Sequence, residues 1–269
     1  MSTLVSMFSY HFMQRALLVG ILVSLCAAML GVSLVLKRYS MIGDGLSHVG
    51  FGALAIASAF HLAPLAVAVP VVVIAAVLLL RLSQTSPVKG DAAIALISSS
   101  ALAIGIVCVS VTTGMNTEVS SYMFGSVLSL SRSDAVLSVL LSLGVLLLFV
   151  LFYPRLFAVT FDETFSKATG IPTEWYNTLL AVLTAVTVVV GMRMMGALLI
   201  SSLIIFPALS AMRVCRSFRS VIFCAALIAA GCFVAGLIAS YLLETPTGAS
   251  IVLADLLVFA VCSLLRGRH

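Results

Sequence analysis

The chain has little charge: only 9% of its 269 residues are Asp, Glu, Lys or Arg, whereas 62% are hydrophobic. Average soluble domains hold about 25% charged residues, so this composition excludes an ordinary soluble fold. The sequence also lacks linkers, low-complexity tracts and a convincing internal repeat, so we expect one domain over residues 1–269. The net charge of +5 is interpreted as loop charge that orients a membrane protein, and no nucleic-acid partner is expected.

Two motifs of known chemistry are missing. There is no His-Glu-x-x-His string, which a helical zinc protease needs. There is also no Gly-x-x-x-x-Gly-Lys-Ser/Thr phosphate loop, so any ATP-driven step requires a separate subunit. A serine run at 98–100 could supply a nucleophile, but small polar residues are common where membrane helices pack. The sequence therefore argues against an enzyme.

Cysteine occurs six times but without a metal or disulfide pattern. Since no Cys-x-x-Cys pair exists and most of these residues lie in apolar stretches, we interpret them as packing residues. They are Cys26, Cys108, Cys215, Cys224, Cys232 and Cys262. Met192, Met194 and Met195, near a predicted outer turn, are interpreted in the same way.

Apolar runs long enough to cross ~30 Å of hydrocarbon recur along the chain. We predict an all-α, polytopic membrane protein with about nine spanning helices. Eight or ten are alternatives, because the turn at 191–195 is short and residues 120–131 could form a re-entrant helix. The expected spans are residues 15–36, 43–61, 64–81, 92–112, 134–153, 175–191, 195–212, 220–242 and 249–265.

Basic residues set the expected orientation. Eleven of the fourteen fall on the same side as Lys37 and Arg38, and only Arg15, Arg132 and Arg193 fall on the other. Cytoplasmic loops carry the excess of Lys and Arg, so the N-terminus is expected outside and the C-terminus inside.

An acid and an imidazole lie at the head of the second expected span. Asp44 and His48 are four residues apart, which puts them on one face of a helix. Ionisable groups in a bilayer are costly and face a protein interior or an aqueous path. Alone, Asp44 could be a helix cap and His48 a hydrogen-bonded packing residue. Together, their oxygen and nitrogen donors suit Zn(II), Mn(II) or Fe(II), which predicts a site for a divalent cation.

Three further acids are weaker candidates for a cation pathway. Glu118 and Glu244 are expected in outer loops, where they could raise the local cation concentration, although solvated loop residues explain them equally well. Asp255 lies in the last expected span, where an acid suggests function by default, but it could also pair with a neighbouring helix.

The segment 160–172, between the fifth and sixth spans, is too polar to cross a membrane. Thr160 or Asp162 can cap the start of a short surface helix, and Gly170 followed by Pro172 can end it. By local chemistry alone this helix is an ordinary connector. The alternative is a docking helix for a soluble motor.

One stretch resembles a known family. Residues 36–48 combine a basic pair with the pattern Gly-Asp-x-x-Ser-His, and this is similar to permease subunits of ABC importers for zinc, manganese and related metals. The resemblance extends over nearly the whole chain. Further matching stretches are Asp91–Ile94, Tyr122–Ser126, Gly196–Ser202 and Pro207–Ala208.

The resemblance implies a permease in the bacterial cytoplasmic membrane that forms a homodimer. It also implies partners: ATP-binding cassette ATPase subunits on the cytoplasmic side and an extracytoplasmic metal-binding protein outside. Asp44 and His48 would contact the metal, and the short helix would dock on the ATPase rather than serve as a plain connector. The expected coupling residues are Asp162, Glu163, Phe165, Ala168 and Gly170.

No permanently bound cofactor is expected, because the metal is the cargo. We predict Zn(II), with Mn(II) or Fe(II) as alternatives in the same family. Since one chain offers two ligands, a second copy could complete the coordination shell. An ion-coupled secondary carrier is the alternative from another class, although the sequence shows no secure repeat of its halves.

Overall fold

The computed structural model describes residues 11–85, 90–112 and 132–266, and within these residues every regular element is a helix. The all-α prediction is therefore confirmed. Glu118, the matching stretch at 122–126 and the possible re-entrant segment lie outside the described residues. The helices are α2 (His11–Leu36), α3 (Ile42–Ala59), α4 (Pro64–Thr85), α5 (Gly90–Thr112), α7 (Arg132–Leu151), α8 (Tyr153–Phe161), α9 (Glu163–Ala168), α10 (Thr173–Met195), α11 (Ala197–Val214), α12 (Phe218–Leu243) and α13 (Thr247–Arg266).

Eight of the described helices are long and apolar enough to cross a membrane: α2, α4, α5, α7, α10, α11, α12 and α13. This count lies within the predicted range. The remaining long helix, α3, carries Asp44, Ser47, His48 and several glycines, which lower its hydropathy. It is buried along most of its length by α5, α4, α10 and α11, so neighbouring helices rather than lipid surround it.

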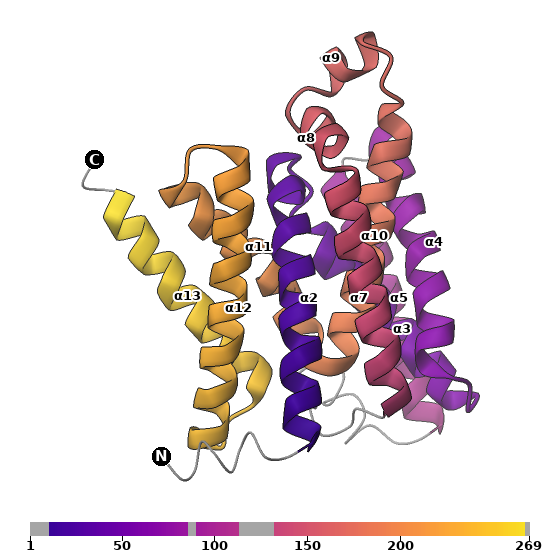
Figure 1. Cartoon of the computed structure of the whole chain (residues 1–269). Coiled ribbons are helices and arrows are strands. Elements are labelled where there is room, and N and C mark those ends of the chain that lie inside the picture. The colour runs from indigo at the N-terminus through magenta and orange to yellow at the C-terminus, as the bar shows by residue number, and fades with distance from the viewer. Residues whose placement is uncertain (1–10, 86–89, 113–131, 267–269) are drawn as a thin grey trace.

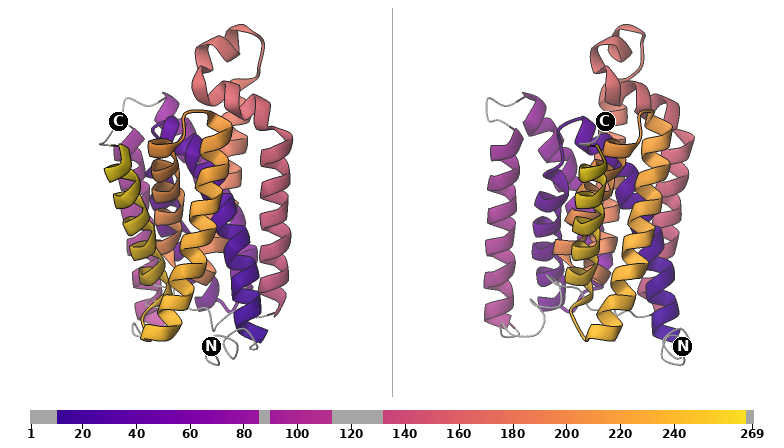
Figure 2. Two further views of the ribbon diagram at one scale, coloured as in Figure 1. Left: turned by 60° about the vertical axis from the view of Figure 1, so that its left-hand side comes forward. Right: turned by 90° about the vertical axis from the view of Figure 1, so that its left-hand side faces the viewer.

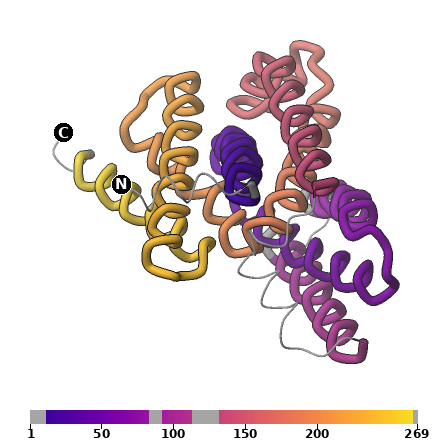
Figure 3. Tube along the Cα trace, turned by 60° about the horizontal axis from the view of Figure 1, so that its bottom comes forward, coloured from indigo at the N-terminus to yellow at the C-terminus, as the bar shows by residue number. Residues whose placement is uncertain are grey.

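The helices run up and down in one bundle, with α2 near its centre (Figure 1). From one end of the bundle, α11, α12 and α13 lie on one side of α2, and α3, α4 and α5 lie on the other (Figure 3). The described chain starts and finishes at opposite ends of the bundle, as expected for an odd number of long helices. Which end faces the cytoplasm stays a prediction from the basic residues.

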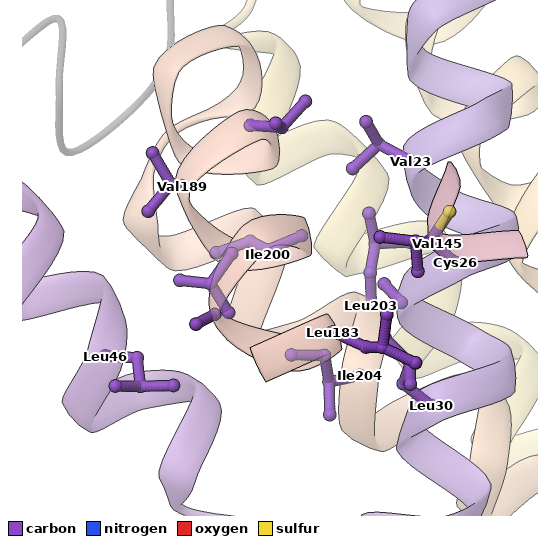
Figure 4. Close-up of a cluster of buried hydrophobic side chains, with 14 of the residues drawn as sticks. Val23, Cys26, Leu30, Leu46, Val145, Leu183, Val189, Ile200, Leu203 and Ile204 are labelled. Atoms are coloured by element: carbon purple, nitrogen blue, oxygen red, sulfur yellow. The ribbon is translucent and has the colours of Figure 1, made fainter. Parts of the chain in front are cut away.

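Apolar side chains fill the centre of the bundle. Val23 and Leu30 of α2 gather with Leu183 of α10 and with Leu203 and Ile204 of α11 (Figure 4). All five side chains are buried. In a membrane the hydrophobic effect does not hold helices together, because lipid tails are as apolar as these side chains. Close van der Waals packing of this kind stabilises the bundle instead.

Glycines bring α3 unusually close to α5. A Cβ atom on Gly52 would lie 2.7 Å from the carbonyl oxygen of Ala101, and one on Gly105 would lie 2.9 Å from the Cα of Gly52. The two helices therefore touch backbone to backbone, as small residues allow in membrane bundles. This contact holds α3 and its two ionisable side chains against a neighbour.

A very tight turn separates α10 from α11. Gly196 takes φ +85° and ψ 161°, a backbone conformation that residues other than glycine rarely adopt. Met192, Met194 and Met195 lie directly before this turn, and all three side chains are buried in the core. α10 continues past the predicted limit of 191 and buries them. Their interpretation as packing residues agrees with this burial.

The six cysteines are all unbridged. Cys26, Cys232 and Cys262 are buried, and the others are partly covered. Among the described residues, no group of three or more His, Cys, Asp or Glu side chains is placed to hold a metal ion. The interpretation of the cysteines as packing residues agrees with these positions.

Candidate metal site and docking helix

Asp44 and His48 form a pair on α3. The Nε2 atom of His48 lies 3.7 Å from Oδ2 of Asp44. Two metal–ligand bonds of about 2.1 Å that meet at a tetrahedral angle separate their donor atoms by about 3.4 Å, which is close to this spacing. The pair therefore has nearly the geometry that a shared cation needs.

Exposure distinguishes this pair from the residues around it on α3. The side chains of Asp44 and His48 are 44% and 23% exposed. All other residues from Ile42 to Ala55 are buried. One narrow polar face of α3 is therefore open, and it carries the two predicted ligands.

The geometry excludes Asp44 as the helix cap and shows no hydrogen bond between the two side chains. Met41, not Asp44, is the N-cap of α3, and no side chain caps that end. The 3.7 Å separation is too long for a hydrogen bond, so His48 is not fixed by one to Asp44. Both side chains retain donor atoms that a cation could use.

Ser201 of α11 also reaches the pair. Its Oγ atom donates to Oδ1 of Asp44 at 3.3 Å, and it lies within 3.2 Å of the carbonyl oxygen of Ala197. The turn at Gly196 directs the start of α11 toward α3 and so positions this hydroxyl. Sequence reasoning missed Ser201 as a site residue, although it lies in one of the stretches that match the family.

The other acidic candidates do not join this site within one protomer. Glu244 is an exposed C-cap of α12 with φ +53°. Asp255 is fully buried in α13, and neither carboxylate oxygen has a hydrogen-bond partner in the part of the chain that the structure describes. α13 packs on α11 and α12 and lies across the bundle from α3 (Figure 3). Their roles in a pathway remain predictions.

The short helix α9 forms as predicted. The side chain of Asp162 accepts a 2.8 Å hydrogen bond from the Phe165 amide, which caps the start. Gly170 takes φ +83° after the helix ends, and its amide donates to the carbonyl of Lys167. The next amide, that of Ile171, donates to the carbonyl of Ser166, and the two bonds at this end form a Schellman motif.

Together α8 and α9 project beyond the long helices at one end of the bundle (Figures 1 and 2). Phe165 is 65% exposed on α9, and Ala168 is also exposed. Aromatic rings hold the base of this projection: Phe157 and Phe161 of α8 both contact Phe218 of α12, with centroids 5.0 and 5.6 Å from its ring. The projection therefore offers an apolar tip on an anchored base.

Glu163 has a second connection that the sequence did not predict. Its carboxylate accepts hydrogen bonds from Lys37, at 2.9 Å, and from the Asn177 amide, also at 2.9 Å. Lys37 in turn donates to Oδ1 of Asn177 at 2.7 Å. The start of α9 is thereby joined to the chain that follows α2 and to α10.

A second ion pair links α7 to the end of α10. The guanidinium of Arg193 lies 2.9 Å from the carboxylate of Asp134, and both side chains are about four-fifths buried. Arg193 is three residues before the turn at Gly196. The pair therefore fixes the position from which α11 starts.

Comparison with known proteins places this geometry in a family. Residues 9–266 match the family model described as ABC 3 transport family. The manganese transport system membrane protein MntC of Halalkalibacterium halodurans is 32% identical over 253 residues, covering 94% of this chain and 87% of that protein. The high-affinity zinc uptake system membrane protein ZnuB of Haemophilus influenzae is 29% identical over 259 residues, covering 96% and 99%.

A solved structure is also similar. It is described as PsaBC from Streptococcus pneumoniae in complex with Fab, and the likeness has a TM-score of 0.87 at 30% sequence identity, covering 96% of this chain and 93% of that chain. The family resemblance predicted from residues 36–48 is therefore confirmed. This chain belongs to the ABC 3 transport family, as a metal-type ABC transporter permease: a multi-pass protein of the cell membrane and a transport subunit rather than an enzyme.

Proposed function

We propose that this chain is the membrane-spanning subunit of an ATP-driven importer for divalent metal ions, with Zn(II) as the preferred cargo and Mn(II) or Fe(II) as alternatives. The observation that carries the proposal is the Asp44–His48 pair, with donor atoms 3.7 Å apart on the one open polar face of a buried helix. Nitrogen and oxygen donors suit these three metals, and Zn(II) accepts both in tetrahedral sites.

A second copy of the chain would complete the site. One Asp and one His leave a tetrahedral shell half filled, and the described residues of one protomer contain no third metal ligand of the His, Cys, Asp or Glu type close by. In a two-fold dimer the open faces of two α3 helices could meet, so that four side chains surround one ion. The partial exposure of Asp44 and His48 supports this arrangement.

Such a site would suit transport rather than storage. An importer must hold the ion well enough to replace part of its hydration shell, yet release it when the helices move. Mixed carboxylate and imidazole ligands on separable protomers meet both needs. Cysteine cages would bind more tightly, and the six cysteines of this chain form none.

Energy would enter through α9. The chain has no phosphate loop, so ATP hydrolysis belongs to a partner ATPase that docks on the projecting helix. The exposed Phe165 ring offers the apolar contact that such docking needs. An extracytoplasmic metal-binding protein would deliver the ion at the opposite end of the bundle.

Metal uptake by cells that lack their own importer tests the proposal. Asp44→Ala and His48→Ala should each abolish Zn(II) accumulation, whereas His61→Asn should not. His61 lies just beyond the other end of α3 at φ +53°, a conformation that Asn tolerates. Normal accumulation of every divalent metal in both alanine variants would refute the site.

The energy source separates the two transport classes. If the chain works with an ATPase, uptake should stop when the phosphate-loop lysine of that ATPase is replaced. A secondary carrier would instead keep transporting and would stop when the ion gradient is collapsed.

A further inference from the structure

We propose that Lys37, Glu163 and Asn177 form the mechanical link through which movement of α9 reaches the metal pair. This inference rests on the proposed function, since it assumes that α9 docks on an ATPase and that Asp44 and His48 hold the cargo. The three residues would be positioning residues, because none of them touches the metal.

Their contacts form a closed triangle. Lys37 donates to both Glu163 and Asn177, and Asn177 donates to Glu163, with distances of 2.9, 2.7 and 2.9 Å. Each corner comes from a different segment: the turn after α2, the start of α9 and the second turn of α10. Three hydrogen bonds that join three segments resist sliding of any one segment past the others, whereas a single hydrogen bond can pivot.

Burial makes the contacts of this triangle necessary for Lys37. The Lys37 side chain is only 7% exposed, and Asn177 is buried. A buried ammonium group loses most of its hydration, so it requires its two oxygen partners. The outer corner, Glu163, is 46% exposed and lies on the helix that projects from the bundle.

The path from Lys37 to the metal pair is stiff. Arg38 takes φ +62°, and the amides of Arg38 and Tyr39 donate to the carbonyls of Val35 and Leu34, which closes the end of α2 in a Schellman motif. The carbonyl of Tyr39 then accepts from the Ile42 amide at the start of α3. Only six residues therefore separate Lys37 from Asp44, and hydrogen-bonded turns hold the chain between them.

Asn177 gives a second path to the same site. It lies on α10, which continues without a break to the turn at Gly196 and then to α11. Ser201 of α11 donates to the carboxylate of Asp44. The triangle thus meets both segments that converge on the metal pair: α3 through Lys37, and α10–α11 through Asn177.

The α9 side of the link is equally well held. Asp162 caps the helix, a Schellman ending closes it, and the aromatic contacts of α8 with Phe218 anchor its base. A push on the exposed tip of α9 therefore moves Glu163 rather than bending the helix away from it.

The test uses proteoliposomes that contain the full chain and its ATPase, with Zn(II) as the probe. The quantity measured is the transport ratio, which is the number of metal ions transported per ATP hydrolysed. Lys37→Met combined with Asn177→Leu removes the two buried corners and leaves on α9 only Glu163, whose side chain is 46% exposed and can be hydrated, so that no unpaired buried ion is left. The complex should assemble and hydrolyse ATP, but the transport ratio should fall at least about 5-fold, the lower end of typical coupling between sites. An unchanged ratio overturns the link.

Tyr176→Phe is the matched control. It removes the 3.3 Å contact between the Tyr176 hydroxyl and Arg155, next to Asn177 but outside the triangle. Its transport ratio should equal that of the unchanged protein. A loss as large as that in the double variant would show that any polar change here uncouples transport, which also overturns the link.

Glu163→Gln keeps the test decisive if the double variant does not fold. Glutamine can still accept a hydrogen bond from Lys37, so this variant should fold and give a ratio between those of the unchanged and double variants. An unchanged ratio in Glu163→Gln contradicts the link. If the unchanged complex itself moves no divalent metal, the proposed function fails instead, and the two failures are distinct.

Discussion

The backbone contact between α3 and α5 should make Gly52 intolerant of any side chain. In Gly52→Ala the new methyl carbon would lie 2.7 Å from the carbonyl oxygen of Ala101 and 3.4 Å from its carbonyl carbon. These atoms belong to a helix backbone and cannot rotate away as a side chain could. The two helices must therefore move apart, and α3 carries the metal pair with it.

A matched glycine isolates the size of this effect. Gly144 lies in α7, and a Cβ atom there would meet nothing within 4 Å. Replacement by alanine favours the helix at both positions, by about 0.8–1.0 kcal/mol on peptide scales. Only Gly52→Ala adds overpacking, which typically costs about 1–3 kcal/mol. Gly52→Ala should therefore be less stable than Gly144→Ala by about 1–3 kcal/mol.

Unfolding titrations with SDS in mixed micelles would measure the difference in the free energy of unfolding. Zn(II) affinity measured on the same samples should fall for Gly52→Ala and stay unchanged for Gly144→Ala. Equal stability of the two variants would show that α3 and α5 do not touch at Gly52, and would refute the packing that positions the metal pair.

Three further variants test other parts of the structure. Asp134→Ala leaves Arg193 without the carboxylate 2.9 Å away, so the free energy of unfolding should fall by about 3 kcal/mol in the same titration; an unchanged value would mean that the pair is not formed. Gly196→Ala forces a side chain into φ +85°, which should cost about 1–3 kcal/mol and weaken Zn(II) binding by displacing Ser201; full stability would contradict the turn. Phe165→Ala should weaken binding to the ATPase about 10–100-fold, as measured by surface plasmon resonance. Burial of a large apolar side chain contributes about 1.5–3 kcal/mol to the binding free energy, and the variant loses this contribution. Wild-type affinity would exclude Phe165 from the docking surface.

The order of the helices could be predicted because each long apolar run is a local signal. Their limits were less predictable. The span expected at 175–191 continues to Met195, since tertiary packing covers the methionines and only the conformation of Gly196 ends the helix. α3 was also expected as a spanning helix; its small and polar residues lower its hydropathy, and neighbouring helices cover most of it.

Half of the site could be predicted in the same local way. Asp44 and His48 are one helical turn apart, so their common face follows from spacing alone. Ser201 is 157 residues from Asp44 along the chain, and Lys37 is 126 residues from Glu163 and 140 from Asn177. One sequence holds no local signal for such pairings, because they depend on how the turns at Arg38 and Gly196 place whole helices.

The stoichiometry of Zn(II) binding tests the central claim most directly. Equilibrium dialysis of the purified chain with its ATPase should give one ion for every two copies of the chain. Asp44→Ala and His48→Ala should each remove that binding, and His61→Asn should retain it. One ion per chain, or binding that survives both alanine variants, would contradict a cargo site shared by the α3 helices of two protomers.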